Sequence, residues 1–75
     1  MSFVIAIADL VEKDVSMKRF EARSLKECQE KVMNYVINQF EWNDDMTFPD
    51  EYNSFVELMK EYDIILSNIT DVDLI

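Results

Sequence analysis

The side chains of this sequence that could do chemistry are its carboxylates. The chain has 16 Asp and Glu residues among its 75 residues, against 7 Lys and Arg. Two groups of oxygen-bearing side chains are close enough in sequence to be weighed as ligands for a hard cation: Asn43, Asp44, Asp45 and Asp50, and separately Asp71 and Asp73. Neither group has the spacing of an EF-hand loop, which needs a central Gly and a closing Glu. We therefore expect no metal site.

The remaining residue types argue against catalysis. The sequence has no His and no Gly, so Ser-His and Cys-His arrangements are excluded within the chain, as are glycine-rich phosphate-binding loops. The single Cys28 lies on the apolar stripe of a predicted helix, which favours a buried small hydrophobe over a reactive thiolate. An acid dyad would need a cleft that a domain this small rarely encloses. We expect a protein that is not an enzyme and binds no cofactor.

Length and composition bound the fold and its setting. A chain of 75 residues allows one small core, and 49% hydrophobic residues are enough to order it. We expect a single domain over residues 1–75, with 71–75 as a looser tail. The longest apolar run, residues 3–8, is far short of the roughly 20 residues that span a bilayer. A lone Cys cannot form an intrachain disulfide, so the sequence favours a cytoplasmic protein, in the host cytoplasm if a phage encodes it.

Two strands are predicted at the start of the chain. Residues 3–11 form a near-continuous apolar run, the pattern of a central strand covered on both faces. A polar loop at 12–14 follows, with Asp14 as the candidate for a left-handed conformation. In residues 15–23, Val15 and Met17 have one parity and Phe20 the other, which indicates a bulge or twist in the second strand.

Two helices and a last strand follow. Ser24 and Glu27 have the spacing of a capping box, and the apolar spacing after them predicts a helix from Leu25 to Phe40. A proline and two acids predict a second helix from Pro49 to Tyr62. A last strand is expected within residues 64–70. The predicted class is α+β, in the order β-β-α-α-β, with an antiparallel hairpin, a last strand and two helices packed on one face.

The charge is distributed unevenly. Residues 1–40 hold six acidic and six basic residues, whereas residues 41–75 hold ten acidic residues and Lys60 alone. The whole net charge of −9 therefore arises in the second half. A basic cluster of Lys18, Arg19, Arg23 and Lys26 is expected to pair with Glu21, Glu27 and Glu30.

We predict a partner-binding surface on the inter-helix loop and the second helix, which combines acids with aromatic and Met side chains. Its members are Glu41, Trp42, Asp44, Asp45, Met46, Phe48, Asp50, Glu57 and Glu61. Two alternatives stay open: the acids are only a solvated face, and Trp42, Met46 and Phe48 cap the core.

These patterns predict a non-catalytic acidic module that docks on a protein with a basic surface. The preferred target is the nucleic-acid channel of a nucleic-acid-handling enzyme. In size, charge and layout the chain resembles the small acidic inhibitors that bacteriophages encode against restriction or CRISPR enzymes, which implies a DNA mimic. Direct binding to nucleic acid or anionic membrane is not expected, because both rely on Lys and Arg. The alternative is a homodimeric structural or regulatory subunit, antitoxin-like or an adaptor, that associates through strand one or the first helix.

Overall fold

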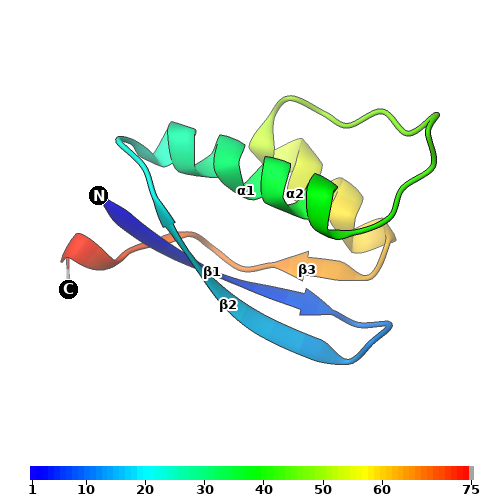
Figure 1. Cartoon of the computed structure of the whole chain (residues 1–75), viewed down its shortest axis with the longest axis horizontal. Coiled ribbons are helices and arrows are strands. Elements are labelled where there is room, and N and C mark those ends of the chain that lie inside the picture. Colours follow the sequence, from blue (N-terminus) through cyan, green and yellow to red (C-terminus); the bar gives the residue numbers. More distant parts are fainter. Residues whose placement is uncertain (75) are drawn as a thin grey trace.

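The fold is a small antiparallel sheet with two helices (Figure 1). A computed structural model describes residues 1–74 of the chain. The elements in chain order are β1 (Ser2–Asp9), β2 (Asp14–Glu21), α1 (Leu25–Gln39), α2 (Tyr52–Glu61), β3 (Ile64–Leu66), β4 (Thr70–Asp71) and a 3-10 helix (Val72–Leu74). The α+β class and the order β-β-α-α-β are confirmed.

Strand β1 is the centre of the sheet. It pairs with β2 on one side, and with β3 and then β4 on the other. Between the pairs Ala8↔Ile65 and Val4↔Thr70 the register shifts by one residue, so β3 and β4 form one edge interrupted by a bulge. Ser67 holds the bulge, because its amide donates to the Ala6 carbonyl at 3.0 Å and its hydroxyl accepts from the Ala6 amide at 2.9 Å.

The core lies between the sheet and the helices, which cover the same face of the sheet (Figure 1). The sheet contributes Phe3, Ile5 and Ile7 of β1, all buried. The helices contribute Cys28, Val32, Val36, Phe55 and Met59, each with 0% of its surface exposed. Burial raises the pKa of the Cys28 thiol, and the prediction that Cys28 packs as a small hydrophobe is confirmed.

Helix α1 begins as predicted, but its capping box is only half formed. The Ser24 hydroxyl accepts a hydrogen bond from the Glu27 amide at 3.2 Å. The Glu27 carboxylate accepts from the amide of Arg23 at 3.4 Å instead of the Ser24 amide, because it also binds the Arg23 guanidinium at 3.0 Å. The helix ends at Gln39, one residue before the predicted Phe40.

Helix α2 begins at Tyr52, so the predicted start at Pro49 is wrong. The Glu51 carboxylate caps this helix by accepting from the amides of Asn53 at 3.0 Å and Ser54 at 2.8 Å. An acid at the cap also faces the positive end of the helix dipole. Because Glu51 satisfies these amides, the helix starts directly after it and Pro49 remains in the loop.

The hairpin differs from the prediction in its turn. Asp14 pairs with Asp9 and is the first residue of β2, so it has extended geometry. The left-handed residue is Lys13, with φ of 55°. The carboxylate of Asp9 accepts from the amides of Val11 at 3.0 Å and Glu12 at 3.2 Å, and this turn leaves Lys13 to reverse the chain.

The structure corrects two expectations for the strands: the bulge, which was one of two alternatives for β2, and the cover on both faces of β1. The register of β1 with β2 runs without interruption from Ser2↔Glu21 to Asp9↔Asp14, so β2 has no bulge. Val15 and Met17 therefore lie on the sheet face away from the helices, whereas Phe20 lies on the helix face. The apolar residues of β1 on the outer face, Val4, Ala6 and Ala8, are partly exposed. Within residues 1–74, helices cover β1 on one face and not on both.

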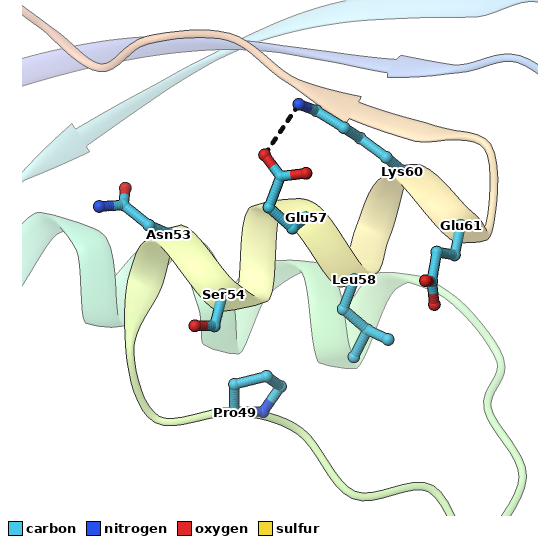
Figure 2. Close-up of a pocket in the computed structure, with 7 residues that line it drawn as sticks. All are labelled: Pro49, Asn53, Ser54, Glu57, Leu58, Lys60 and Glu61. Atoms are coloured by element: carbon cyan, nitrogen blue, oxygen red, sulfur yellow. Dashed lines mark hydrogen bonds and ion pairs between the residues drawn. The ribbon is translucent and has the colours of Figure 1, made fainter.

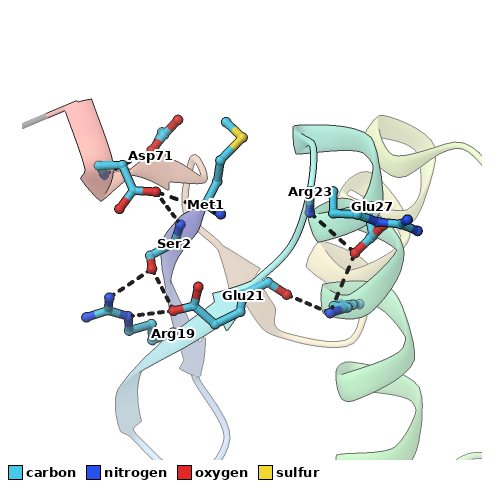
Figure 3. A network of polar contacts seen from close by, with 9 residues as sticks. Met1, Ser2, Arg19, Glu21, Arg23, Glu27 and Asp71 are labelled. Carbon is cyan, nitrogen blue, oxygen red and sulfur yellow. Dashed lines mark hydrogen bonds and ion pairs between the residues drawn. The ribbon is translucent and has the colours of Figure 1, made fainter.

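A polar network ties the N-terminus to the end of the described chain (Figure 3). The amide of Ser2 donates to the Asp73 carboxylate at 2.8 Å, and the Ser2 hydroxyl donates to Glu21 at 2.6 Å. The bond from Ser2, together with the Arg19 guanidinium at 3.3 Å, lowers the pKa of Glu21. In the segment predicted as a looser tail, Asp71 belongs to β4 and 72–74 to the 3-10 helix; Ile75 lies outside the described residues.

The cap of α1 gives a direct stability test. Replacing Ser24 by Ala removes the acceptor for the Glu27 amide and should lower the free energy of unfolding by about 1 kcal/mol. Urea denaturation followed by circular dichroism measures this change. The control Asn34→Ala, at an exposed position inside α1, should be neutral or slightly stabilising. Equal stabilities of Ser24→Ala and the wild type would contradict the capping role.

Candidate functional site

The aromatic residues of the predicted surface form a cluster at one end of α2. Trp42 packs edge-on against Phe48 and Tyr62, with ring centroids 5.3 Å away in each case, and against Phe40 at 6.4 Å. The Tyr62 hydroxyl donates to the Met46 sulfur at 3.6 Å. Trp42, Met46 and Phe48 are all partly buried. This is the arrangement that the core-cap alternative expects, with the loop folded back onto the helix.

The six acids of the predicted surface are all exposed: Glu41, Asp44, Asp45, Asp50, Glu57 and Glu61. Glu57 and Glu61 line one shallow depression on α2, beside Pro49 and Leu58 (Figure 2). The side of α2 that carries them is opposite the one that buries Phe55.

The other four acids are spread along the loop between the helices. Glu41 lies in a depression beside Trp42. Asp44 and Asp45 form an exposed turn, closed by the Met46 amide donating to the Asn43 carbonyl at 2.9 Å. Asp50 lines a depression with residues of α1, including Lys26. The structure therefore brings Glu57 and Glu61 to one depression, whereas Asp50 lines a different one.

Sequence reasoning missed the contribution of Lys60. Its ammonium pairs with the Glu57 carboxylate at 3.0 Å, and Figure 2 shows the two side chains pointing toward each other. The spacing of three residues on a helix was the available signal. Both side chains are substantially exposed, so the pair contributes little to stability. The Lys60 ammonium does offset part of the negative charge of Glu57.

The predicted basic cluster is largely paired. Arg19 binds Glu21 at 3.3 Å and Arg23 binds Glu27 at 3.0 Å, as expected. The Arg23 side chain, followed by its amide, lowers the pKa of Glu27. Lys18 lies over the ring of Tyr35, 5.5 Å from its centroid, in a cation–π contact. The expected pairing is therefore met for Arg19 and Arg23, whereas within residues 1–74 neither Lys26 nor Glu30 forms an ion pair.

Two titratable side chains of the interior, Tyr52 and Cys28, stay protonated at neutral pH. Burial raises the pKa of Tyr52 to about 12 and raises the pKa of Cys28, so both remain protonated. Among residues 1–74, no three Cys, Asp or Glu side chains converge on a point where a metal ion would sit. In the same residues, neither helix is both long and apolar enough to cross a membrane.

Comparison with known proteins gives no relative. No protein-family model matches this chain, and no match was found among curated proteins or solved structures.

The Glu51 cap should make stability depend on pH. Hydrogen bonds from the Ser54 amide, the Asn53 amide and the Ser54 hydroxyl lower the pKa of Glu51 below 4.5. A carboxyl group whose pKa is lower in the folded state than in the unfolded state stabilises the fold at pH values above its unfolded-state pKa. This stabilisation is lost as the pH falls through the folded-state pKa. In urea titrations from pH 7 to pH 3, Glu51→Gln should therefore lose less stability below about pH 4.5 than the wild type. Glu51→Asp, which keeps a capping carboxylate, should retain the wild-type slope; a similar slope for Glu51→Gln would contradict the assignment.

Trp42 tests whether the aromatic cluster is structural. Replacing Trp42 by Ala should lower the free energy of unfolding by about 2–3 kcal/mol, because three ring contacts are lost at a partly buried site. Trp42→Phe should cost less, because it keeps ring contacts and removes an indole N–H that is buried without a hydrogen-bond partner in residues 1–74. Urea denaturation measures both. A Trp42→Ala variant as stable as the wild type would show that the indole does not cap the core.

Proposed function

We propose that the chain is a non-catalytic binding module that inhibits by occupation, docking its acidic helix side into a basic groove. The observation that carries this proposal is the group of exposed acids on the loop and α2, against which residues 41–75 supply Lys60 as the single cation. The target class is a nuclease or another nucleic-acid-handling protein, as for inhibitors of the anti-restriction or anti-CRISPR kind. Module and target would meet in the cytoplasm of the host cell of a phage.

The charge distribution supports a basic partner. The first half holds equal numbers of acidic and basic residues and is therefore neutral, and within it Arg19 pairs with Glu21 and Arg23 with Glu27. The second half has an uncompensated negative field, which destabilises a small domain through self-repulsion. The same field would steer a basic surface toward the module and raise the association rate.

The depression on α2 supports a defined contact within this field. Glu57 and Glu61 offer carboxylates that accept bidentate hydrogen bonds from Arg, in the place of nucleic-acid phosphates. Pro49 and Leu58 line the same depression, and part of each side chain is exposed there (Figure 2). These two residues would add apolar contact area that phosphates lack. Trp42 packs inward, and we assign the apolar contact to Pro49 and Leu58 instead.

Charge neutralisation tests the proposal. A variant with Asp44→Asn, Asp45→Asn, Glu57→Gln and Glu61→Gln keeps side-chain size and should fold like the wild type. Immobilised wild-type protein is incubated with nuclease-treated bacterial lysate at about 50 mM and 300 mM salt, and captured proteins are identified by mass spectrometry. We expect capture of a nucleic-acid-handling protein at low salt, release of that protein by duplex DNA, and at least tenfold weaker capture by the variant.

The control variant removes the same number of charges elsewhere, with Glu12→Gln, Asp14→Asn, Glu30→Gln and Asp63→Asn. All four positions are exposed and lie outside the predicted surface. This control should retain most of the capture. Equal loss in both variants would show that only total charge matters, and failure of duplex DNA to release the captured protein would contradict occupation of a nucleic-acid channel.

A further inference from the structure

The outer face of the sheet has no covering layer in residues 1–74. It is apolar toward the turn of the β1–β2 hairpin and charged at Arg19 and Glu21 of β2. Paired residues share a face, so the pairs Ala6↔Met17, Ala8↔Val15 and Ala8↔Ile65 place a set of apolar side chains on the side away from the helices. In an antiparallel sheet with one covered face, the other face is normally polar. Met17 and Val15 are the most exposed of this set, at 65% and 68%. Both belong to β2, the outermost strand.

The backbone of β2 also has an unpaired edge. The amide of Ala22 donates to the Met1 carbonyl at 3.0 Å, and bonded pairs alternate along an antiparallel ladder. The register then makes Phe3↔Phe20, Ile5↔Lys18 and Ile7↔Ser16 the bonded pairs. The amides and carbonyls of the residues between them point away from β1. The Glu21 carbonyl accepts from the Lys31 ammonium at 2.6 Å, which leaves Val15, Met17 and Arg19 as the open part of this edge. No strand of residues 1–74 pairs with them, and β2 lies at the margin of the sheet in Figure 1.

The two edges of the sheet differ in how they are protected. The β3–β4 edge consists of short strands, is interrupted by the bulge at Ser67 and is blunted against further pairing. By contrast, β2 has eight residues, no Pro and a regular register. A long regular edge that also carries exposed apolar side chains is the feature that natural sheets otherwise avoid.

We propose that the occupant of this edge is a second copy of the chain, whose β2 pairs antiparallel with the first about a twofold axis at Met17. The sheet would then continue through both copies, with the Met17 side chains in contact on the outer face. The residues around the axis lie in the neutral half of the sequence. The acidic loop and α2 belong to the layer on the other face (Figure 1), so the excess negative charge of each copy stays away from the axis.

Charge and length select this register. A twofold axis is allowed only where it brings the outward-pointing amides and carbonyls of the two β2 strands together. Among the allowed axes, those at Met17 and Lys18 pair the largest part of β2. An axis at Lys18 places two Lys18 ammonium groups face to face, which is unfavourable. An axis at Met17 pairs residues 14–20 with the second copy, joins the Met17 side chains at the centre and places Val15 opposite Arg19 rather than like charges opposite each other. Pairing of one strand buries less surface than the roughly 800 Å² per partner that is typical of stable interfaces. The dimer should therefore be reversible.

Cysteine cross-linking tests both the dimer and its register. Across a bonded antiparallel pair the Cα atoms are about 5.5 Å apart, a distance that a disulfide spans. Under mild oxidation at about 100 µM protein, Met17→Cys should form at least tenfold more covalent dimer than Val15→Cys, its equally exposed control, because Val15 then faces Arg19 of the second copy. A mixture of Val15→Cys and Arg19→Cys should form the mixed dimer. Cys28 is buried and stays out of the reaction.

Sedimentation equilibrium of the wild-type chain gives the second measurement. We expect dimerisation that increases with concentration and is undiminished at 300 mM salt, because screening reduces repulsion between acidic copies. Met17→Pro, which removes an outward-pointing amide, should be a folded monomer. A wild-type monomer at about 1 mM, or Val15→Cys cross-linking as readily as Met17→Cys, would overturn the proposal. The salt dependence of partner capture tests only the acidic surface, and dimerisation tests only the β2 edge. Failure of one proposal therefore leaves the other standing.

Discussion

The architecture depends on one constraint: β1 is apolar on both faces, and the described chain supplies helices for one of them. Phe3, Ile5 and Ile7 are buried beneath α1 and α2, and this contact fixes β1 at the centre of the sheet. Hydrogen bonding on both sides of β1 then places β2 at one edge and the bulged β3–β4 segment at the other. The outer face keeps its apolar side chains without a covering layer, so the molecule has one closed side and one open side.

Charge follows the same division. Acids and bases balance in residues 1–40, where pairs such as Arg23 with Glu27 hold the hairpin to the first helix. The acids that make up the net charge of −9 are in residues 41–75, on the loop, α2 and the C-terminal strands. The two surfaces therefore favour different contacts. A basic partner would bind the acidic side through interactions that salt weakens, whereas backbone pairing along β2 is insensitive to salt.

Sequence reasoning found the elements because apolar periodicity is strong in α1, α2 and β1. It misplaced what depends on single side chains: Glu51 moved the start of α2 by capping it, and Asp9 organised the hairpin turn. It also offered a bulge or a twist for the mixed parity of β2, and the bulge is absent. A pattern of apolar residues does not say whether a face is covered. At the candidate site, exposure of Glu57 and Glu61 followed from the helical spacing of α2. The inward packing of Trp42 did not, because loop residues have no periodicity.

Amide hydrogen exchange of the wild-type chain, measured by NMR at about 10 µM and about 1 mM, tests the central claim that the open side is completed by a second copy. We expect the amides of Ser16, Lys18 and Phe20 to be protected at both concentrations, because they bond to β1. The amides of Val15, Met17 and Arg19 should exchange quickly in the dilute sample and become protected in the concentrated one. Fast exchange of these three amides at both concentrations would contradict the claim.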